Sequence, residues 1–197
     1  MNIYLVRHGE TDNNYNKIYY GKIDCSLNNN GRYQASIIKN RIEEINFDKV
    51  FTSEMKRAKE TAHIILNDSK YELIEDERLN EMNMGIFEGK DHKELEENYS
   101  VEWKSWCNNW KEYKIPDGES YIEFYERVKD FFEEILRGEE KDILVVAHGG
   151  VMKSIYSYIL GENLDIFWKI SSRNGDIALI KYEYGNIYID SIIPVEI

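Results

Sequence analysis

The sequence has little cysteine, little proline and an excess of acidic over basic residues. Its two cysteines, Cys25 and Cys107, lie far apart in dissimilar contexts, which is typical neither of a disulfide framework nor of a Cys-x-x-Cys metal site. The 25 Lys and Arg residues against 37 Asp and Glu leave a formal net charge of −12. Because nucleic-acid binding depends on basic side chains that neutralise phosphates, we predict no nucleic-acid partner.

Long apolar runs are absent from the sequence as well. Arg7 and Glu10 interrupt the first apolar stretch, and no later stretch approaches the ~20 apolar residues of a membrane span. We therefore predict no signal peptide and no membrane partner, and the unpaired cysteines favour a cytoplasmic location. A chain of this length can bury about 70% of its unfolded surface. We expect one domain over residues 1–197.

Short apolar runs alternate with amphipathic stretches along the chain. Residues 2–6 and 142–147 are continuous apolar runs, typical of strands covered on both faces, and residues 175–193 predict a closing hairpin. This alternation predicts an α/β fold, a three-layer sandwich with a mostly parallel sheet flanked by helices and an antiparallel edge. The other predicted elements are strands at 49–52 and 71–74 and helices from about 32 to 45, 53–66, 91–113, 120–136 and 151–160.

Two predicted strands end in a His-Gly pair, Arg7-His8-Gly9 at the first and His148-Gly149-Gly150 at the later one. In open α/β sheets, ligands bind outside the carboxyl ends of the strands. The glycines let backbone approach a ligand closely, and a helix that follows directs free N–H groups at an anion. Either histidine alone could be a polar residue at a strand end, but the two together with an arginine predict an anion-binding site.

The chemistry of this pattern suits phosphoryl transfer. A neutral imidazole can attack phosphorus with one nitrogen while a backbone hydrogen bond to the other sets the tautomer. Catalysis of phosphate-ester cleavage also needs donors aimed at the equatorial oxygens, and without a metal motif these are arginine and protonated histidine. We expect no metal and no cofactor. A metal-dependent hydrolase with His8 and His148 as ligands is the rival hypothesis, although no carboxylate cluster accompanies them.

Five blocks of residues, in order, resemble the histidine phosphatase superfamily, which includes the phosphoglycerate mutases. The first is LVRHGET at residues 5–11, followed by Asn14. The ordered set covers about residues 3–155 and implies a phosphoglycerate mutase-like fold. The later blocks are SEMKRAKETA at 53–62, LNEMNMGIFEG at 79–89, GES at 118–120 and VAHGGV at 146–151.

This resemblance implies a role for each matching residue. His8 would be the phosphorylated nucleophile, and Glu81 would act as general acid toward the leaving oxygen and then as base toward water. Arg7, Arg57 and His148 would surround the phosphoryl group. The last matching residue is Asn14, which would contact substrate or phosphate, with turn formation as the alternative.

The chain departs from the family pattern at Ile18 and Tyr20, where relatives often have Arg and Gln before Gly21. Substrate contacts of that loop are therefore not carried over. Residues 90–116 contain no arginine, whereas a phosphoglycerate mutase must hold a second anionic group, so hydrolysis is favoured over mutase-type phosphoryl transfer. A non-catalytic module that binds a phosphorylated ligand is the other alternative. The expected partner is a small-molecule phosphate ester; the oligomeric state stays open, a homodimer included.

Residues 90–116 are expected to form a helical cap over the active site. Trp103, Trp106 and Trp110 share a helical face there, and we favour a packing stripe, with substrate contact as the alternative. The compact length and this tryptophan-bearing segment resemble α-ribazole phosphatase of cobalamin nucleotide-loop assembly. Sugar-phosphate and broad-specificity phosphatases look nearly as similar.

Overall fold

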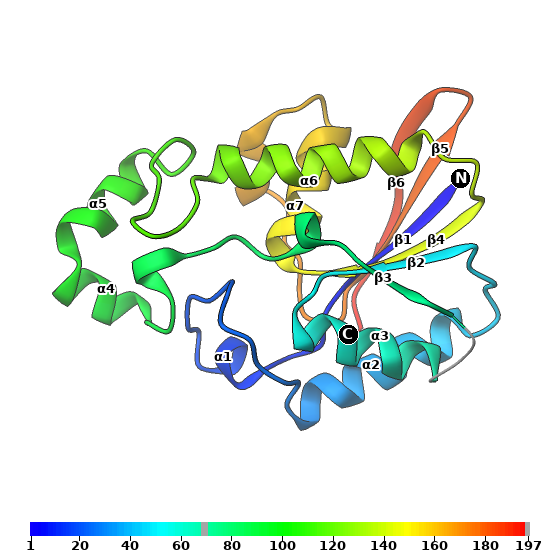
Figure 1. The fold of residues 1–197 in the computed structure, drawn as a ribbon, viewed down its shortest axis with the longest axis horizontal. Helices are drawn as coiled ribbons and strands as arrows, with labels where there is room; N and C mark the ends of the chain where they lie inside the picture. The colour runs from blue at the N-terminus through cyan, green and yellow to red at the C-terminus, as the bar shows by residue number, and fades with distance from the viewer. Residues whose placement is uncertain (68–70, 196–197) are drawn as a thin grey trace.

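The computed structural model describes residues 1–67 and 71–195. In those ranges six strands form one sheet, in which β1, β2, β3 and β4 are parallel and β5 and β6 form an antiparallel edge (Figure 1). The sheet thus has the mixed topology predicted from the sequence. The spatial order of the strands is β3 (Leu73–Glu75), β2 (Lys49–Thr52), β4 (Asp142–Ala147), β1 (Asn2–Arg7), β5 (Ile177–Glu183) and β6 (Asn186–Ile193).

Helices cover both faces of the sheet, with α2 (Asn29–Ile42) and α3 (Lys56–Leu66) on one face and α6 (Tyr121–Leu136) and α7 (Gly149–Ile159) on the other. Successive side chains of a strand point to opposite faces, so both faces of β4 are buried. The three-layer α/β architecture is confirmed. Toward α6 and α7 point Ile143, Val145 and Ala147, and toward α2 and α3 point Leu144 and Val146.

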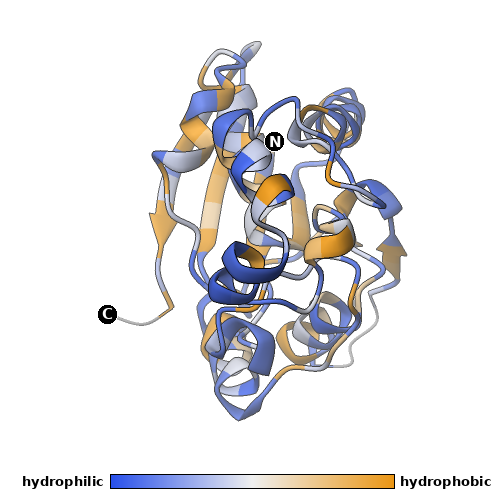
Figure 2. Cartoon of the chain, turned by 90° about the vertical axis from the view of Figure 1, so that its left-hand side faces the viewer, coloured by the Kyte–Doolittle hydropathy of each residue, from blue (hydrophilic) through white to orange (hydrophobic). Residues whose placement is uncertain are grey.

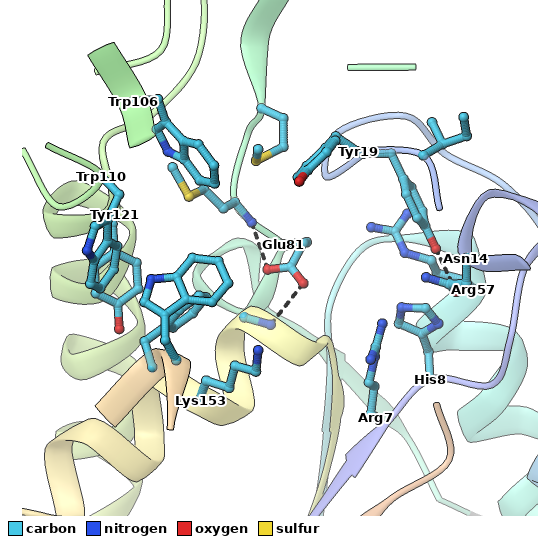
Figure 3. Close-up of a pocket in the computed structure, with 17 residues that line it drawn as sticks. Arg7, His8, Asn14, Tyr19, Arg57, Glu81, Trp106, Trp110, Tyr121 and Lys153 are labelled. Carbon is cyan, nitrogen blue, oxygen red and sulfur yellow. Dashed lines mark hydrogen bonds between the residues drawn. The ribbon is translucent and has the colours of Figure 1, made fainter. Parts of the chain in front are cut away.

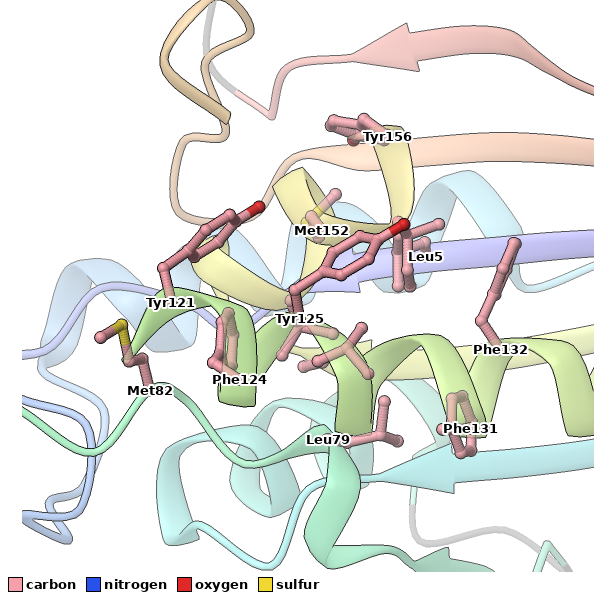
Figure 4. Packing of buried hydrophobic residues seen from close by; sticks show 14 of the residues in the cluster. Leu5, Leu79, Met82, Tyr121, Phe124, Tyr125, Phe131, Phe132, Met152 and Tyr156 are labelled. Atoms are coloured by element: carbon pink, nitrogen blue, oxygen red, sulfur yellow. The ribbon is translucent and has the colours of Figure 1, made fainter. Parts of the chain in front are cut away.

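The larger of the two hydrophobic clusters lies between the sheet and α6. Phe124 and Phe132 of α6 pack there with Leu5 of β1, and all three side chains are fully buried (Figure 4). Figure 2 shows hydrophobic residues on the strands between the helical layers and many hydrophilic residues on the helices. Burial of this apolar surface is the main favourable contribution to folding, and it sets the frame that positions the loops at the strand ends.

Several predicted element boundaries differ from the observed ones. The helix expected from residue 53 begins at Lys56, because Met55 keeps an extended backbone and its N–H donates to Ser53 Oγ. The helix expected from 151 begins two residues earlier, and the one expected to reach 45 ends at Ile42. The strand expected at 71–74 spans Leu73–Glu75. The hairpin and the strands at 49–52 and 142–147 match their predicted positions closely.

The stretch predicted as one helix over 91–113 consists of two, α4 (His92–Asn98) and α5 (Ser100–Asn108). Tyr99 separates them with φ −132° and ψ 36°. In Figure 1 both lie at the end of the molecule away from the sheet. Their action as a cap, like the extent of a single domain over residues 1–197, stays a prediction. Short elements that the sequence did not predict are α1 (Asp12–Tyr15) and the 3₁₀ turns η1 (Glu77–Leu79), η2 (Gly85–Phe87) and η3 (Leu164–Trp168).

No helix within the described ranges is both long enough and apolar enough to cross a membrane.

Candidate active site

His8 and His148 follow the carboxyl ends of two adjacent strands. β1 and β4 pair in parallel, and the last registered pair is Arg7 with Ala147. Because parallel neighbours end at the same edge of a sheet, the next residue of each strand reaches the same place. The two imidazole rings lie 5.1 Å apart between centroids, and both side chains are buried. The structure therefore brings together the two histidines that the sequence singled out.

The His8 ring is held in one tautomer and kept uncharged. Its Nδ1–H donates to the carbonyl oxygen of Gly9 at 2.7 Å, and because a carbonyl only accepts, Nδ1 carries the proton and Nε2 keeps its lone pair. Burial, and then the nearby charges of Arg57 and Arg7, lower the pKa of His8 well below its ordinary value of 6.5. The predicted backbone hydrogen bond is present, and the ring is neutral at pH 7.

The surroundings of His148 also favour its neutral form. Arg57 Nε donates to its Nδ1 at 3.3 Å, so its other nitrogen, Nε2, carries the proton toward Ser53 Oγ at 2.7 Å. Burial lowers the pKa of His148 well below 6.5, and the cations Arg57 and Arg7 lower it further. An anion bound beside the ring would act in the opposite direction and favour its protonated form.

The two predicted arginines converge on the same place from different elements. Arg57 lies in the first turn of α3, fully buried, and its Nη2 and Nη1 donate to the carbonyls of Gly21 at 2.8 Å and Ile23 at 3.0 Å. Arg7 at the end of β1 donates from Nη1 to Ser172 O at 2.5 Å, and its buried Nε has no hydrogen-bond partner among the described residues. Arg57 thus ties the 21–23 loop to the site, and Arg7 keeps its Nε–H donor unused.

Glu81 is held against the start of α7 by Gly150. The backbone N–H of Gly150 donates to Glu81 Oε2 at 3.0 Å, and that of Met82 donates to Oε1 at 3.0 Å (Figure 3). A Cβ at Gly150 would lie 2.2 Å from Glu81 Oε1, and one at Gly149 would lie 3.2 Å from Arg7 Cζ. The two glycines therefore make room for the carboxylate and the guanidinium, respectively.

The loop that carries Glu81 is held by Arg127 of α6, which the sequence reasoning missed. Arg127 Nη1 donates to Asn80 O at 2.7 Å, and Nη2 donates to Glu81 O at 3.1 Å. Its Nε donates to Glu119 at 2.8 Å, and the other Glu119 oxygen accepts the backbone N–H of Asn83 at 2.9 Å. Arg127 occupies a position in an amphipathic helix where cations usually face solvent, so no local signal in the sequence pointed to it.

Asn14 forms a turn, which is one of the two roles that the sequence left open. As the third residue of α1 it forms a capping box with Thr11, whose backbone N–H donates to Asn14 Oδ1 at 3.1 Å. Tyr20 OH and Asn174 Nδ2 donate to the same oxygen at 2.9 and 3.1 Å. Asn14 therefore forms the turn, and it also lines the cavity with its amide. Contact with a substrate stays a prediction.

Some of these side chains form one end of a cavity of about 250 Å³, which neither His148 nor Arg127 lines. All three tryptophans pack in or against the larger hydrophobic cluster, as predicted, and Trp106 and Trp110 also line the cavity, whereas Trp103, which stacks on Trp106 at 5.1 Å, does not. In the described parts of the chain no three His, Cys, Asp or Glu side chains gather as metal ligands. Predicted residues at the polar end are Arg7, His8, Asn14, Arg57 and Glu81; lining residues that the sequence did not predict include Tyr19, Tyr121, Lys153, Phe167 and Trp168.

A model of the histidine phosphatase superfamily, branch 1, matches residues 3–193. The chain belongs to this superfamily. Adenosylcobalamin/alpha-ribazole phosphatase of Escherichia coli K12 is 31% identical over 89% of this chain and 87% of its own. Phosphoserine phosphatase 1 of Hydrogenobacter thermophilus is 29% identical over 93% and 87%. The crystal structure of alpha-ribazole phosphatase from Shigella flexneri superposes with a TM-score of 0.93 and 28% identity, covering 99% of this chain and 97% of that one.

Histidine phosphatases of this similarity include enzymes named for different substrates. Membership of the superfamily agrees with the observed fold.

Proposed function

We propose that this protein is a phosphomonoesterase that hydrolyses a small phosphate ester through a phosphohistidine on His8. One observation carries the proposal. The lone pair of His8 Nε2 is available at neutral pH because Nδ1–H is bound to Gly9 O and because burial and two arginines keep the ring uncharged. The same arginines supply the positive charge that a phosphoryl group requires.

Cleavage then proceeds in two steps. His8 Nε2 bonds to phosphorus as the bond from phosphorus to the leaving oxygen breaks, and Glu81 gives that oxygen a proton. In the second step water attacks phosphorus, Glu81 takes a proton from it, and the bond between Nε2 and phosphorus breaks. Arg7, Arg57 and His148 stabilise the charge on the equatorial oxygens in both steps. The protein needs no metal for this sequence of events.

The remainder of the cavity supports hydrolysis of a substrate with one phosphate. Beyond the polar end the lining is chiefly aromatic, and the 90–116 segment contains no arginine to bind a second anionic group. The names of two relatives make α-ribazole 5′-phosphate and phosphoserine the first esters to test. We propose α-ribazole 5′-phosphate as the leading candidate, because an aromatic lining suits a ring better than a compact amino acid.

The first test is His8→Ala, assayed for phosphate released from phenyl phosphate. We expect turnover to fall by at least about 10³-fold because the nucleophile is lost, while the melting temperature stays close to that of the wild type. His92→Ala is the matched control, since His92 is exposed on α4. Acid-labile phosphate should label the wild type and not the His8 variant, and EDTA should leave turnover unchanged.

Each competing hypothesis gives a different result in these assays. Turnover retained by the His8 variant refutes the nucleophile, and turnover lost with EDTA supports a metal-dependent hydrolase. Isomerised product from 3-phosphoglycerate supports a mutase. Tight binding of phosphate esters without turnover supports a non-catalytic module.

A further inference from the structure

Lys153 is a cation in the cavity that the two-step mechanism does not use. It lies on α7 three residues after Gly150, one helical turn beyond the glycines that border Arg7 and Glu81. The side chain is half-buried, and among the described residues its ammonium makes no hydrogen bond or ion pair. It lies instead over two aromatic rings, 4.9 Å from the Phe167 centroid and 5.4 Å from that of Trp168.

The position of Lys153 separates the polar end of the cavity from the aromatic end. In Figure 3 its side chain reaches from α7 toward the centre of the cavity, below Glu81, with Arg7 on one side and the rings of Trp106 and Trp110 on the other. Because Glu81 is placed to protonate the leaving oxygen, groups beyond it face the alcohol part of an ester. Lys153 therefore lies on the alcohol side of the bond that breaks.

Aromatic rings from two segments form the wall beyond Lys153. Phe167 of η3 stacks on Trp110 at 5.8 Å and 29°, and Trp168 meets Trp106 edge-on at 6.4 Å. Trp168 keeps 56% of its surface exposed although it lines the cavity. A large, partly exposed indole at the mouth of a cavity offers a face on which a planar group can stack.

The ammonium of Lys153 is held in place without its hydrogen-bonding capacity being used. Attraction to the two ring faces fixes its position, and burial together with Arg7 lowers its pKa, while Glu81 opposes this effect. A partly buried ammonium that lacks acceptors is unfavourable, so a ligand oxygen at this point would gain a charge-assisted hydrogen bond. Three N–H donors are available for it.

We propose that Lys153 determines specificity by binding an oxygen acceptor in the alcohol part of the substrate, while Phe167 and Trp168 hold an aromatic ring attached to it. The substrate class is a phosphate monoester in which an oxygen-rich linker joins the phosphate to a planar heterocycle, as in a nucleoside monophosphate. This inference rests on the proposed function, because the alcohol side is defined by phosphate at His8.

The test compares Lys153→Met with the wild type on three esters. Phenyl phosphate has a ring without linker oxygens, ribose 5-phosphate has the oxygens without a ring, and adenosine 5′-monophosphate has both. For the two ribose esters we expect KM to rise about 10-fold or more, as for loss of a hydrogen bond to a charged group, with kcat within twofold. For phenyl phosphate both constants should stay within twofold.

Two further variants separate recognition from a structural role. Lys153→Arg keeps the charge and should restore KM for the ribose esters to within about threefold of the wild type. Lys169→Met removes an exposed lysine at the end of η3 and should change nothing. Trp168→Leu should raise KM for phenyl phosphate and adenosine 5′-monophosphate but not for ribose 5-phosphate.

An equal rise in KM for all three esters in Lys153→Met would overturn the inference, because Lys153 would then bind the phosphate itself. Unchanged KM values for the ribose esters would overturn it as well. Wild-type protein that hydrolyses none of the three esters, and that is indistinguishable from His8→Ala, contradicts the proposed function, and the Lys153 inference fails with it.

Discussion

Gly150 determines where the carboxylate of Glu81 can lie. The carboxylate occupies space that a Cβ at position 150 would need, and it accepts the glycine's own N–H. A helix N-terminus stabilises a nearby negative charge through its free N–H groups and its dipole. At the scale of single residues, the His-Gly-Gly sequence thus supplies the imidazole of His148 and the backbone N–H that holds Glu81, both of which are proposed to act in catalysis.

Glu81→Gln should slow esters with poor leaving groups more than those with good ones, because the proton donor to the leaving oxygen is lost. We expect kcat/KM for phenyl phosphate to fall by about 10²-fold, and that for 4-nitrophenyl phosphate to fall clearly less. Gly150→Ala should show the same dependence on the leaving group, since the new methyl group displaces the carboxylate of Glu81.

The control is Gly138→Ala, where the added Cβ would chiefly meet the mobile end of the Glu140 side chain. Equal slowing of both aryl esters by Glu81→Gln would show that Glu81 only organises its loop.

At the scale of elements, α6 both packs the core and positions the acid loop. Its apolar face is buried against the sheet through residues such as Phe124 and Phe131. Its start is fixed by the capping box of Ser120 and Glu123. From the edge of this helix Arg127 reaches four carbonyls and one carboxylate of the segments around Glu81. The helix therefore transmits the rigidity of the core to the site.

Arg127→Met should lower kcat for phenyl phosphate by about 10- to 100-fold, because small displacements of a catalytic group are costly. The melting temperature should also fall, since the carbonyls of Arg78, Asn80 and Glu81 lose a hydrogen-bond partner. Arg137→Met, at the exposed end of the same helix, should leave both values near wild type. A variant that loses stability but keeps full kcat would show that Arg127 has a structural role only.

At the scale of the whole molecule, folding buries two imidazoles in their neutral form. In the folded chain, burial and nearby arginines lower the pKa of His8 and of His148. In the unfolded chain these surroundings are lost, and both pKa values are near 6.5. As the pH falls below about 6.5, the unfolded chain therefore binds protons that the folded chain does not. The free energy of unfolding must decrease over this range, and it continues to decrease until the lowered pKa values are reached.

As the pH falls from 7.5 to 5.5, protonation of each histidine in the unfolded chain should lower the free energy of unfolding by about 1.4 kcal/mol. Urea unfolding in phosphate-free buffers measures this difference, because bound phosphate would itself stabilise the folded state. His8→Asn should lose about half of the pH dependence, whereas His92→Gln, an exposed control, should keep it. Identical pH profiles for wild type and His8→Asn would mean that His8 titrates alike in both states.

Local patterns predicted most of the elements. The mismatches arise from contacts and chain breaks that those patterns do not show. Residues 53–55 continue the helical pattern of α3, yet Ser53 accepts the N–H of Met55 and pairs with the ring of His148, which follows the adjacent strand β4. The periodicity of residues 91–113 gave no sign of the break at Tyr99. Trp103, Trp106 and Trp110 share one predicted face, but only two of them reach the cavity, because Trp103 packs on Trp106.

The sequence by itself determined the strands, most helices and the residues at the polar end of the cavity. Periodicity, capping and the His-Gly motifs predict these features because each depends on residues close together along the chain. Only the tertiary structure decided the charge state of His148, the anchoring of the Glu81 loop by Arg127, and the place of Lys153 beside the η3 rings. Each of these depends on burial and on electrostatic or packing contacts between segments far apart in sequence. Such contacts form only when the sheet brings its strand ends together.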